Sequence, residues 1–354
     1  MTQQWDNPLA SDLDGVLAQA GDDLRALRGA RLFITGGTGF VGTWLLESFT
    51  WANRTLNLGA EATVLTRHPD AFAKKAPHLA ADSAVSLVRG DVSDLSALSG
   101  PFTHVIHAAA ELGTHRGEPG PLKVVDTTVG GTRNVLEAAR GWGVQNVLFV
   151  SSGAVYGRQP GDLGRVPEDW MGGPDPLTVG SAYSESKRLA ELLCGIYGGQ
   201  YGMSVKIARP FAFVGPYLSL DSHFAIGNFV RDGLAGGPIM VRGDGTPIRS
   251  YLYAADLAAW LWGILVRGVS GRAYNVGSEE EFSVAQIAAL VAKSFDPEPE
   301  VVVATRADLC GAGGGNRYVP STARARTELG LEQTVSISDA IARIIGWNRR
   351  PISE

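Results

Sequence analysis

The sequence has few cysteines, no long hydrophobic run and no excess of basic residues. It holds two cysteines, Cys194 and Cys310, and their separation matches no metal-ligand spacing, so a reducing cytoplasm is the expected location. The longest apolar run, residues 257–266, is too short to span a bilayer. The net charge of -5 provides no basic surface for nucleic acid or an anionic membrane. We therefore expect neither of these as a partner.

Two further absences narrow the class of protein. The six histidines form no HxxxH or HxH cluster, which predicts that no metal is bound. Residues 1–28 have neither the basic start nor the apolar core of a signal peptide. Their apolar residues instead recur at helical spacing, which predicts an amphipathic helix over residues 9–28 that ends at Gly29.

Glycine, by contrast, is abundant, and three of the 45 glycines form a GxxGxxG motif. Gly36, Gly39 and Gly42 follow the apolar residues 32–34, which are typical of a buried parallel strand. The first glycine permits a tight turn, the second lets a backbone approach a pyrophosphate, and the third lets the next helix pack closely on the strand. The motif therefore predicts a dinucleotide site at the N-terminus of a helix over residues 41–56.

Strands and helices are predicted to alternate along the following residues. This rhythm indicates an α/β fold of the Rossmann type, with a doubly wound parallel sheet and right-handed crossovers. The expected strands are residues 62–66, 85–88, 103–107, 147–150 and 204–208, and the expected helices are residues 127–141 and 183–201. Beyond Arg209, clusters of glycine and proline indicate shorter elements and a smaller, mostly C-terminal substrate-binding lobe.

We divide the chain into three parts on this basis. Residues 1–29 are an N-terminal helical extension, and residues 30–208, joined by about 246–277, are the dinucleotide-binding unit. The lobe comprises residues 209–245 and 278–354. Within the joined segment, Trp260 and Trp262 lie at helical spacing and are expected in the core.

Three residues form a candidate catalytic set. Ser152 ends a predicted strand, and Tyr183 and Lys187 lie about one turn apart on a predicted helix, on the same face. A neighbouring ammonium favours tyrosinate, so we expect Lys187 to lower the pKa of Tyr183. Such a tyrosine can exchange a hydroxyl proton while a hydride moves to or from a nicotinamide ring, and a serine hydroxyl can hold the substrate oxygen. The alternative is a chance helical pair beside a strand-end serine.

With these motifs the chain resembles the extended short-chain dehydrogenase/reductases that act on nucleotide sugars. Besides the glycine motif and the Ser/Tyr/Lys set, the resemblance rests on GDV (90–92), HAAA (107–110), GGTRNVLEAA (130–139), RPFAFVGP (209–216), GNFV (227–230), GDGTPIRSYLY (243–253) and YNVG (274–277). It covers residues 31 to about 277 and implies a nucleotide-sugar substrate, a nicotinamide cofactor and a homodimer formed through the Tyr–Lys helix. Leu189, Leu192, Leu193 and Ile196 provide an apolar stripe for such a dimer or for the core.

The resemblance assigns candidate roles to individual residues. The cofactor is expected to contact Gly36, Thr38, Gly39, Phe40, Val41, Gly42, Arg67, Asp91, Val92, Ala108, Ala109, Ala110, Tyr183, Lys187 and Pro210. The substrate is expected to contact Ser152, Ala154, Asn228, Arg249, His115 and His223. Arg249 would grip the pyrophosphate, which suits the bidentate geometry of a guanidinium, and Asn228 would help to seat it. His115 and His223 are either substrate contacts or solvated loop residues.

Departures from the family pattern narrow the reaction. Family dehydratases carry an Asp–Glu pair where this chain has Gly153 and Ala154, and decarboxylases carry Glu in place of Ala154. The pair of acids that elimination requires is therefore absent, which disfavours both dehydration and decarboxylation unless Glu111, His115 or Glu185 replaces it from another segment. Ala212 and Thr128 each stand where the family has Asn, which alters hydrogen bonding around the substrate and the tyrosine.

The predicted second strand ends at Arg67 without the acid that usually binds the ribose hydroxyls of NAD. This favours NADP over NAD, although Arg67 can instead stack on adenine or point to solvent.

The function predicted from these observations is an NAD(P)-dependent oxidoreductase or epimerase acting at C4 of a nucleotide-linked hexose. Reduction of a 4-keto sugar is slightly favoured over 4-epimerisation. The alternatives are a 4,6-dehydratase or decarboxylase with a relocated acid or base, and a non-catalytic dinucleotide-sensing protein.

Overall fold

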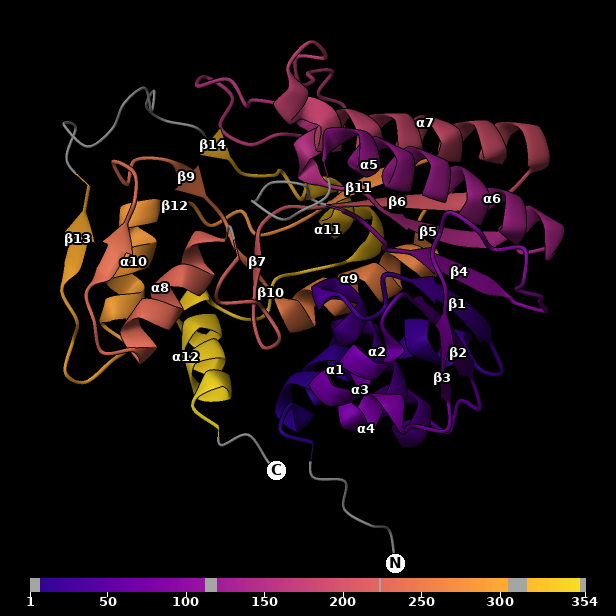
Figure 1. Cartoon of the computed structure of the whole chain (residues 1–354), viewed down its shortest axis with the longest axis horizontal. Coiled ribbons are helices and arrows are strands. Elements are labelled where there is room, and N and C mark those ends of the chain that lie inside the picture. Colours follow the sequence, from indigo (N-terminus) through magenta and orange to yellow (C-terminus); the bar gives the residue numbers. More distant parts are fainter. Residues whose placement is uncertain (1–6, 112–119, 223, 305–316, 351–354) are drawn as a thin grey trace, which may run out of the picture.

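A seven-stranded parallel sheet forms the centre of the computed structural model, which describes residues 7–111, 120–222, 224–304 and 317–350 (Figure 1). Its spatial order is β11-β6-β5-β4-β1-β2-β3, and neighbouring strands are parallel throughout. The strands are β1 (Arg31–Thr35), β2 (Glu61–Thr66), β3 (Val85–Arg89), β4 (His104–His107), β5 (Asn146–Val150), β6 (Ser204–Pro210) and β11 (Ala273–Val276). The chain order reverses between β1 and β4, and ligands of open α/β sheets bind at such a switch point.

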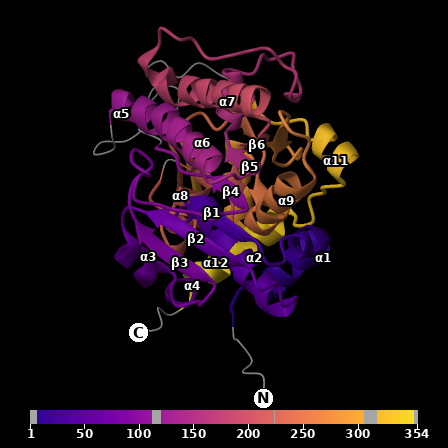
Figure 2. The ribbon, with the colours of Figure 1, turned by 90° about the vertical axis from the view of Figure 1, so that its right-hand side faces the viewer.

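Helices cover both faces of this sheet (Figure 2). One face carries α1 (Ala10–Ala26), α2 (Phe40–Thr55) and α9 (Ala254–Arg267). The other carries α5 (Pro121–Val125), a π-helical turn (Asp126–Gly130), α6 (Gly131–Gly141) and α7 (Ala182–Tyr201). The short helices α3 (Pro69–Lys75) and α4 (Pro77–Ala80) lie between β2 and β3 in the chain.

The strand residues alternate between two cores. Leu32 and Ile34 of β1 pack with α1, α2 and α9, whereas Phe33 between them packs with α6 and α7. Phe33 also meets the ring of Trp142 edge-on, with ring centroids 5.0 Å apart. Both faces are apolar because β1 is a central strand that is covered on each side, as its continuous hydrophobic run predicts.

The smaller lobe lies beyond the carboxyl ends of the strands (Figure 1). Its helices are α8 (Ala225–Leu234), α10 (Val284–Ala292) and α12 (Ile337–Asn348), whereas α11 (Ala323–Leu329) lies beside the seven-stranded sheet. Its short strands pair as β7 (Phe213–Val214) with β10 (Leu252–Tyr253), as β8 (Ile239–Val241) with β13 (Val301–Val303), and as β9 (Ile248–Arg249) with both β12 (Phe282–Ser283) and β14 (Arg317–Tyr318). Helix α11 packs against β11 and α9, and α12 packs against α8 and α10.

The predicted Rossmann-type fold is confirmed. The expected strands and helices from residue 9 to residue 208 occur within a few residues of their predicted bounds, and Trp260 and Trp262 are buried in α9. The expected helix over residues 127–141 begins instead as the π-helical turn and becomes α-helical at Gly131. In the part of the chain that the structure describes, we find no helix of the length and apolarity needed to cross a membrane. The boundaries given above for the two units stay a prediction.

Candidate active site

A single large cavity of ≈ 1460 Å³ lies between the carboxyl ends of the strands and the lobe. Most of the residues expected to bind cofactor or substrate line it. These are Gly36, Thr38, Gly39, Phe40, Val41, Arg67, Asp91, Val92, Ala108, Ala109, Ala110, Ser152, Ala154, Tyr183, Lys187, Pro210, Asn228 and Arg249. Gly42 does not line the cavity, and His115 and His223 lie outside the described residues.

The glycine motif forms a tight turn from β1 into α2. Gly36 has φ +70°, and a Cβ there would stand 2.4 Å from the carbonyl carbon of Ala108. A Cβ on Gly42 would stand 2.3 Å from the carbonyl oxygen of Gly36, so Gly42 serves helix packing rather than the cavity wall. Gly39 is the N-cap of α2, whose first N–H groups face the cavity end of the turn. The backbone can therefore approach an anion at this helix N-terminus.

Lys75 supports this turn, although nothing in the sequence motif indicated it. Its Nζ donates to the carbonyl oxygen of Thr38 at 3.0 Å and to Oγ1 of Thr43 at 3.2 Å. Burial lowers the pKa of Lys75. The amine thus ties the last turn of α3 to the glycine turn and adds a cation to the cavity wall.

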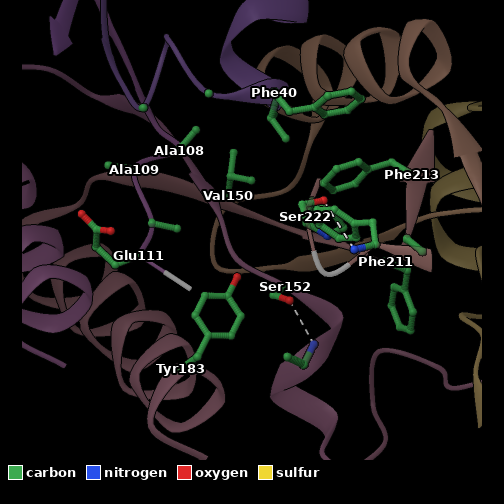
Figure 3. Close-up of a pocket in the computed structure, with 18 of the residues that line it drawn as sticks. Phe40, Ala108, Ala109, Glu111, Val150, Ser152, Tyr183, Phe211, Phe213 and Ser222 are labelled. Atoms are coloured by element: carbon green, nitrogen blue, oxygen red, sulfur yellow. Dashed lines mark hydrogen bonds between the residues drawn. The ribbon is translucent and has the colours of Figure 1, made fainter. Parts of the chain in front are cut away.

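Ser152, Tyr183 and Lys187 meet at the other end of the cavity. Ser152 follows β5 and caps a 3₁₀ turn (Gly153–Tyr156), where its Oγ accepts from the N–H of Ala154 at 3.1 Å. The hydroxyls of Tyr183 and Ser152 point into the same space (Figure 3). Lys187 lies one turn further along α7 and donates from Nζ to the carbonyl oxygen of Val150 at 2.8 Å. The expected convergence of these three side chains is present.

The pKa of Tyr183 is raised in the structure, whereas the sequence predicted it to be lowered. Burial raises the pKa of Tyr183, and a hydrogen bond with Ser152 acts in the opposite direction. Burial also lowers the pKa of Lys187 to about 8, with Glu191 opposing this shift. The prediction that Lys187 lowers the pKa of Tyr183 is therefore wrong for these surroundings, because desolvation penalises the ammonium and the phenolate alike.

Glu191 connects this set to a buried network that we did not anticipate. It accepts from Ser151 Oγ at 2.6 Å and from two nitrogens of Arg209 at 2.9 and 2.6 Å. Arg209 also donates to the hydroxyl of Tyr156 at 2.7 Å. Glu191 lies four residues after Lys187, and that spacing places both on one face of α7. The network holds β5, β6 and α7 together directly behind the catalytic set.

His107, the last residue of β4, is buried and kept neutral. Its Nδ1 lies 2.6 Å from Oγ1 of Thr35, and its Nε2 lies 3.0 Å from Oγ1 of Thr132. Burial lowers the pKa of His107 to about 3, and the charge on Lys187 adds to this. In the unfolded chain the same imidazole titrates near 6.5, so the unfolded state binds more protons between these values.

We expect this difference between the folded and unfolded pKa of His107 to make the protein less stable in acid. The free energy of unfolding should fall as the pH falls from 6.5 towards 3, by about 2 kcal/mol between pH 6.5 and 4.5, since each pH unit corresponds to about 1.4 kcal/mol. Urea unfolding at a series of pH values measures this. His107→Gln should flatten the slope, whereas His68→Gln on the exposed surface should not. An unchanged slope in His107→Gln would show that another group is responsible.

Three cationic side chains of the cavity wall have partners within the protein. Arg67 forms an ion pair with Glu111, which links the end of β2 to the residue after the HAAA segment. Asn228 accepts from Nη1 of Arg231 at 3.2 Å, and Arg231 also pairs with Asp232. Arg249 donates to the carbonyl oxygen of Ile248 at 2.8 Å.

No carboxylate of the described residues occupies the place of the missing elimination pair. The carboxylates that line the cavity are Asp91, Glu111 and Asp232. Glu111 is engaged with Arg67, and Figure 3 shows its carboxylate pointing away from Tyr183. Glu185 lies 3.7 Å from Arg188 and does not line the cavity. The group beside Ser152 is instead the hydroxyl of Tyr318, a residue that sequence reasoning missed.

The residues present fit a dinucleotide. The turn at Gly36 packs directly against the backbone of Ala108, and Gly36, Gly39 and the start of α2 line the cavity beside it. Thr127, in the π-helical turn, lines the cavity with a buried Oγ1 that has no hydrogen-bond partner among the described residues. Such an atom points to a polar ligand, since buried polar groups are normally satisfied.

Comparison with known proteins identifies relatives over most of the chain. It is 28% identical over 324 residues to UDP-glucuronic acid decarboxylase 1 of Arabidopsis thaliana, covering 91% of this chain and 70% of the relative. It is 30% identical over 324 residues to dTDP-glucose 4,6-dehydratase of Streptomyces antibioticus, covering 90% and 92%. Among solved structures, a dTDP-glucose 4,6-dehydratase from Streptomyces venezuelae with NAD bound has a TM-score of 0.74 at 28% identity, covering 90% and 97%. A UDP-glucuronic acid 4-epimerase from Bacillus cereus in complex with NAD has a TM-score of 0.74 at 23% identity, covering 90% and 96%, which shows the shared fold.

These relatives correct two expectations. They support a nucleotide-sugar enzyme, but favour the dehydratase or decarboxylase alternative over 4-keto-reduction. The preference for NADP is not supported, because these solved relatives hold NAD. The physical reason is that Arg67 is already paired with Glu111, whose carboxylate would repel a 2′-phosphate at that position.

A sequence model described as the NAD dependent epimerase/dehydratase family matches residues 32–277. The matched region runs from β1 through β11 and so includes the glycine turn and all three residues of the catalytic set. The match spans more than half of the chain, and the relatives named above cover about nine-tenths of it. The protein therefore belongs to the NAD-dependent epimerase/dehydratase family.

Proposed function

We propose that this protein oxidises C4 of a nucleotide-linked hexuronic acid, using NAD, and releases the carboxyl group at C5 as CO₂. The observation that carries the proposal is the set of three hydroxyls, from Ser152, Tyr183 and Tyr318, at a catalytic end where the described residues place no carboxylate. The relatives with decarboxylase names, which match about nine-tenths of the chain, add support.

The roles of the residues follow from their positions. Ser152 holds the C4 oxygen, Tyr183 accepts its proton, and Lys187 holds the cofactor ribose. Arg249 binds the pyrophosphate of the substrate, and Asn228 helps to seat it. The glycine turn and the α2 N-terminus hold the cofactor pyrophosphate. When bound, NAD supplies the hydride acceptor for C4.

Chemistry favours decarboxylation over dehydration at such a site. Loss of water needs an acid to protonate the leaving hydroxyl and a base to remove the C5 proton. At neutral pH, a set of neutral hydroxyls provides neither a strong acid for the leaving hydroxyl nor a strong base for the C5 proton. By contrast, once C4 is a ketone the C5 carboxylate is β to a carbonyl and can leave as CO₂, because the electrons pass to the ketone oxygen. Hydrogen bonds from Ser152 and Tyr183 would stabilise that oxygen.

The experiment presents the purified enzyme with UDP-glucuronic acid and with dTDP-glucose, in each case with NAD and separately with NADP. We expect CO₂ and a nucleotide-linked pentose from UDP-glucuronic acid with NAD, and weaker turnover with NADP. Proton NMR of the sugar and trapping of ¹³CO₂ from C6-labelled substrate measure this. A 4-keto-6-deoxy product from dTDP-glucose, without CO₂ from the uronic acid, would establish dehydration instead.

The second candidate is 4-epimerisation of the same uronic acid. The hydroxyl set favours it specifically, because inversion at C4 needs proton exchange at the C4 oxygen and no further acid or base. The NMR experiment separates the two, since an epimerase leaves the C6 label in the sugar.

We also propose that the protein is a homodimer that pairs through α5 and α7. Leu122 of α5 and Leu189 and Leu192 of α7 are 81%, 45% and 58% exposed, and α5 lies beside α7. Solvent exposure of several large apolar side chains on adjoining helices is typical of an interface.

We expect Leu192→Glu to convert the dimer into a monomer at micromolar concentration, because a buried unpaired carboxylate costs several kcal/mol. Light scattering after gel filtration measures the mass. Val303→Glu, at a similarly exposed apolar position on β13, serves as the control. A wild-type monomer would contradict the proposal.

A further inference from the structure

We propose that Tyr318 is a further catalytic residue, which contacts the sugar and supplies the proton that C5 receives after CO₂ leaves. This rests on the proposed decarboxylation. Tyr318 belongs to β14, outside the segment that the family model matches, and so brings a residue from the C-terminal part of the chain to the site.

Three contacts place the phenol beside the catalytic set. Strand β14 pairs with β9, and Tyr318 stands opposite Arg249 in that register. The ring of Tyr318 lies against Phe211 with centroids 4.5 Å apart. Its hydroxyl stands 2.7 Å from the position that a Cβ on Gly153 would take. The phenol therefore reaches the first residue after Ser152.

This position explains why residue 153 is glycine. A Cβ there would stand 2.7 Å from the Tyr318 hydroxyl and 2.7 Å from Cε2 of Phe211, closer than real side-chain contacts allow. An acidic side chain at 153 and this placement of Tyr318 thus exclude each other. Residue 154 is alanine, so neither of the two residues after Ser152 has a protic side chain, and among the described residues the phenols of Tyr318 and Tyr183 stand beside Ser152.

The surroundings keep Tyr318 protonated. Burial raises its pKa, and Tyr183 adds to the rise, whereas hydrogen bonding with Ser152 and the charge of Arg249 oppose it. A neutral phenol donates a proton readily to a carbanion but is a poor base at neutral pH. Tyr318 therefore suits protonation of carbon and does not suit removal of the C5 proton.

Loss of CO₂ and protonation of C5 are two successive steps. In the 4-keto uronic acid the C5–C6 bond breaks, CO₂ leaves, and the electron pair forms a C4–C5 enolate whose oxygen faces Tyr183 and Ser152. The O–H bond of Tyr318 then breaks and a C5–H bond forms, as the enolate returns to the ketone. The phenolate regains its proton from water.

The test compares the wild type with Tyr318→Phe in two measurements. The first is the reaction of UDP-glucuronic acid in D₂O, read by NMR as the rate of product formation and the configuration of deuterium at C5. The second is calorimetric binding of UDP-glucuronic acid and of UDP. Tyr274→Phe is the matched control, because it removes a buried phenol hydroxyl that bonds Glu328 at 3.0 Å and does not line the cavity.

We expect Tyr318→Phe to slow product formation by about 10²-fold and to scramble the deuterium configuration, because solvent then protonates C5 from either side. Affinity for UDP-glucuronic acid should fall about fivefold while affinity for UDP stays unchanged, as loss of one sugar hydrogen bond predicts. Tyr274→Phe should keep the deuterium configuration and both affinities.

The failures of the two proposals are distinguishable. If the wild type releases CO₂ and Tyr318→Phe keeps its rate and its single configuration at C5, the role of Tyr318 is overturned and the decarboxylation stands. If the wild type releases no CO₂, the decarboxylation fails and proton donation to C5 fails with it. In that case an unchanged affinity of Tyr318→Phe for UDP-glucuronic acid overturns the sugar contact as well.

Discussion

Tyr183→Phe should lower kcat by 10²–10⁴-fold while the protein stays folded and still binds nucleotide. The substitution removes one hydroxyl, and with it the group that accepts the C4 hydroxyl proton, whose loss in general acid–base catalysis costs about this factor. The ring remains in its half-buried place on α7, and Ser152 and Lys187 keep their other hydrogen bonds. Steady-state rates with UDP-glucuronic acid, together with circular dichroism, measure the effect.

The same substitution elsewhere on α7 provides the control. Tyr201 is 46% exposed at the far end of the helix, so Tyr201→Phe should leave kcat within a factor of two. Activity of Tyr183→Phe within about tenfold of the wild type would defeat the assignment of Tyr183 as the acid–base group. An equal loss in both variants would indicate a general defect of the helix.

Gly36→Ala should weaken NAD binding by about 10²-fold or more. Two costs combine at this position: an L residue at φ +70° is strained, and its Cβ would stand 2.4 Å from the backbone carbon of Ala108. Backbone cannot move aside as a flexible side chain can, so the turn must shift away from β4. Since the first N–H groups of α2 lie just beyond the turn, the shift misplaces the proposed pyrophosphate site. Calorimetric titration with NAD and the thermal midpoint Tm measure the two effects.

Gly29→Ala isolates the first cost, the backbone strain. Gly29 has φ +69°, but a Cβ there meets nothing within 4 Å, so the variant bears the backbone strain without the clash. It should lower stability by about 1 kcal/mol and leave NAD affinity unchanged. If Gly36→Ala binds NAD as tightly as Gly29→Ala does, the glycine turn does not hold the cofactor.

Much of the fold was predictable because its signals are local. The apolar strand at residues 32–34, the glycines after it and the alternating elements up to residue 208 are confirmed, since buried parallel strands and amphipathic helices each leave a periodic pattern. The pairing of Tyr183 with Lys187 was predictable for the same reason, as helical geometry places residues four apart on one face.

The site departs from prediction where distant segments meet. The ion pair of Arg67 with Glu111 joins the ends of two strands that are separated along the chain, and it removes the basis for the NADP preference. Tyr318 reaches Gly153 only because β14 pairs with β9. The pKa of Tyr183 depends on how deeply the phenol is buried, which spacing along a helix does not reveal.

The sequence by itself determined the dinucleotide turn, the order of strands and helices, and the Ser/Tyr/Lys set, because each depends on residues within one or two adjoining elements. Only the tertiary structure decided which groups share the catalytic end of the cavity with that set, that Arg67 is paired with a carboxylate, and that burial raises the pKa of Tyr183 against the effect of its hydrogen bond with Ser152. These depend on distance and on desolvation between segments far apart in the chain, and both quantities exist only once the chain has folded.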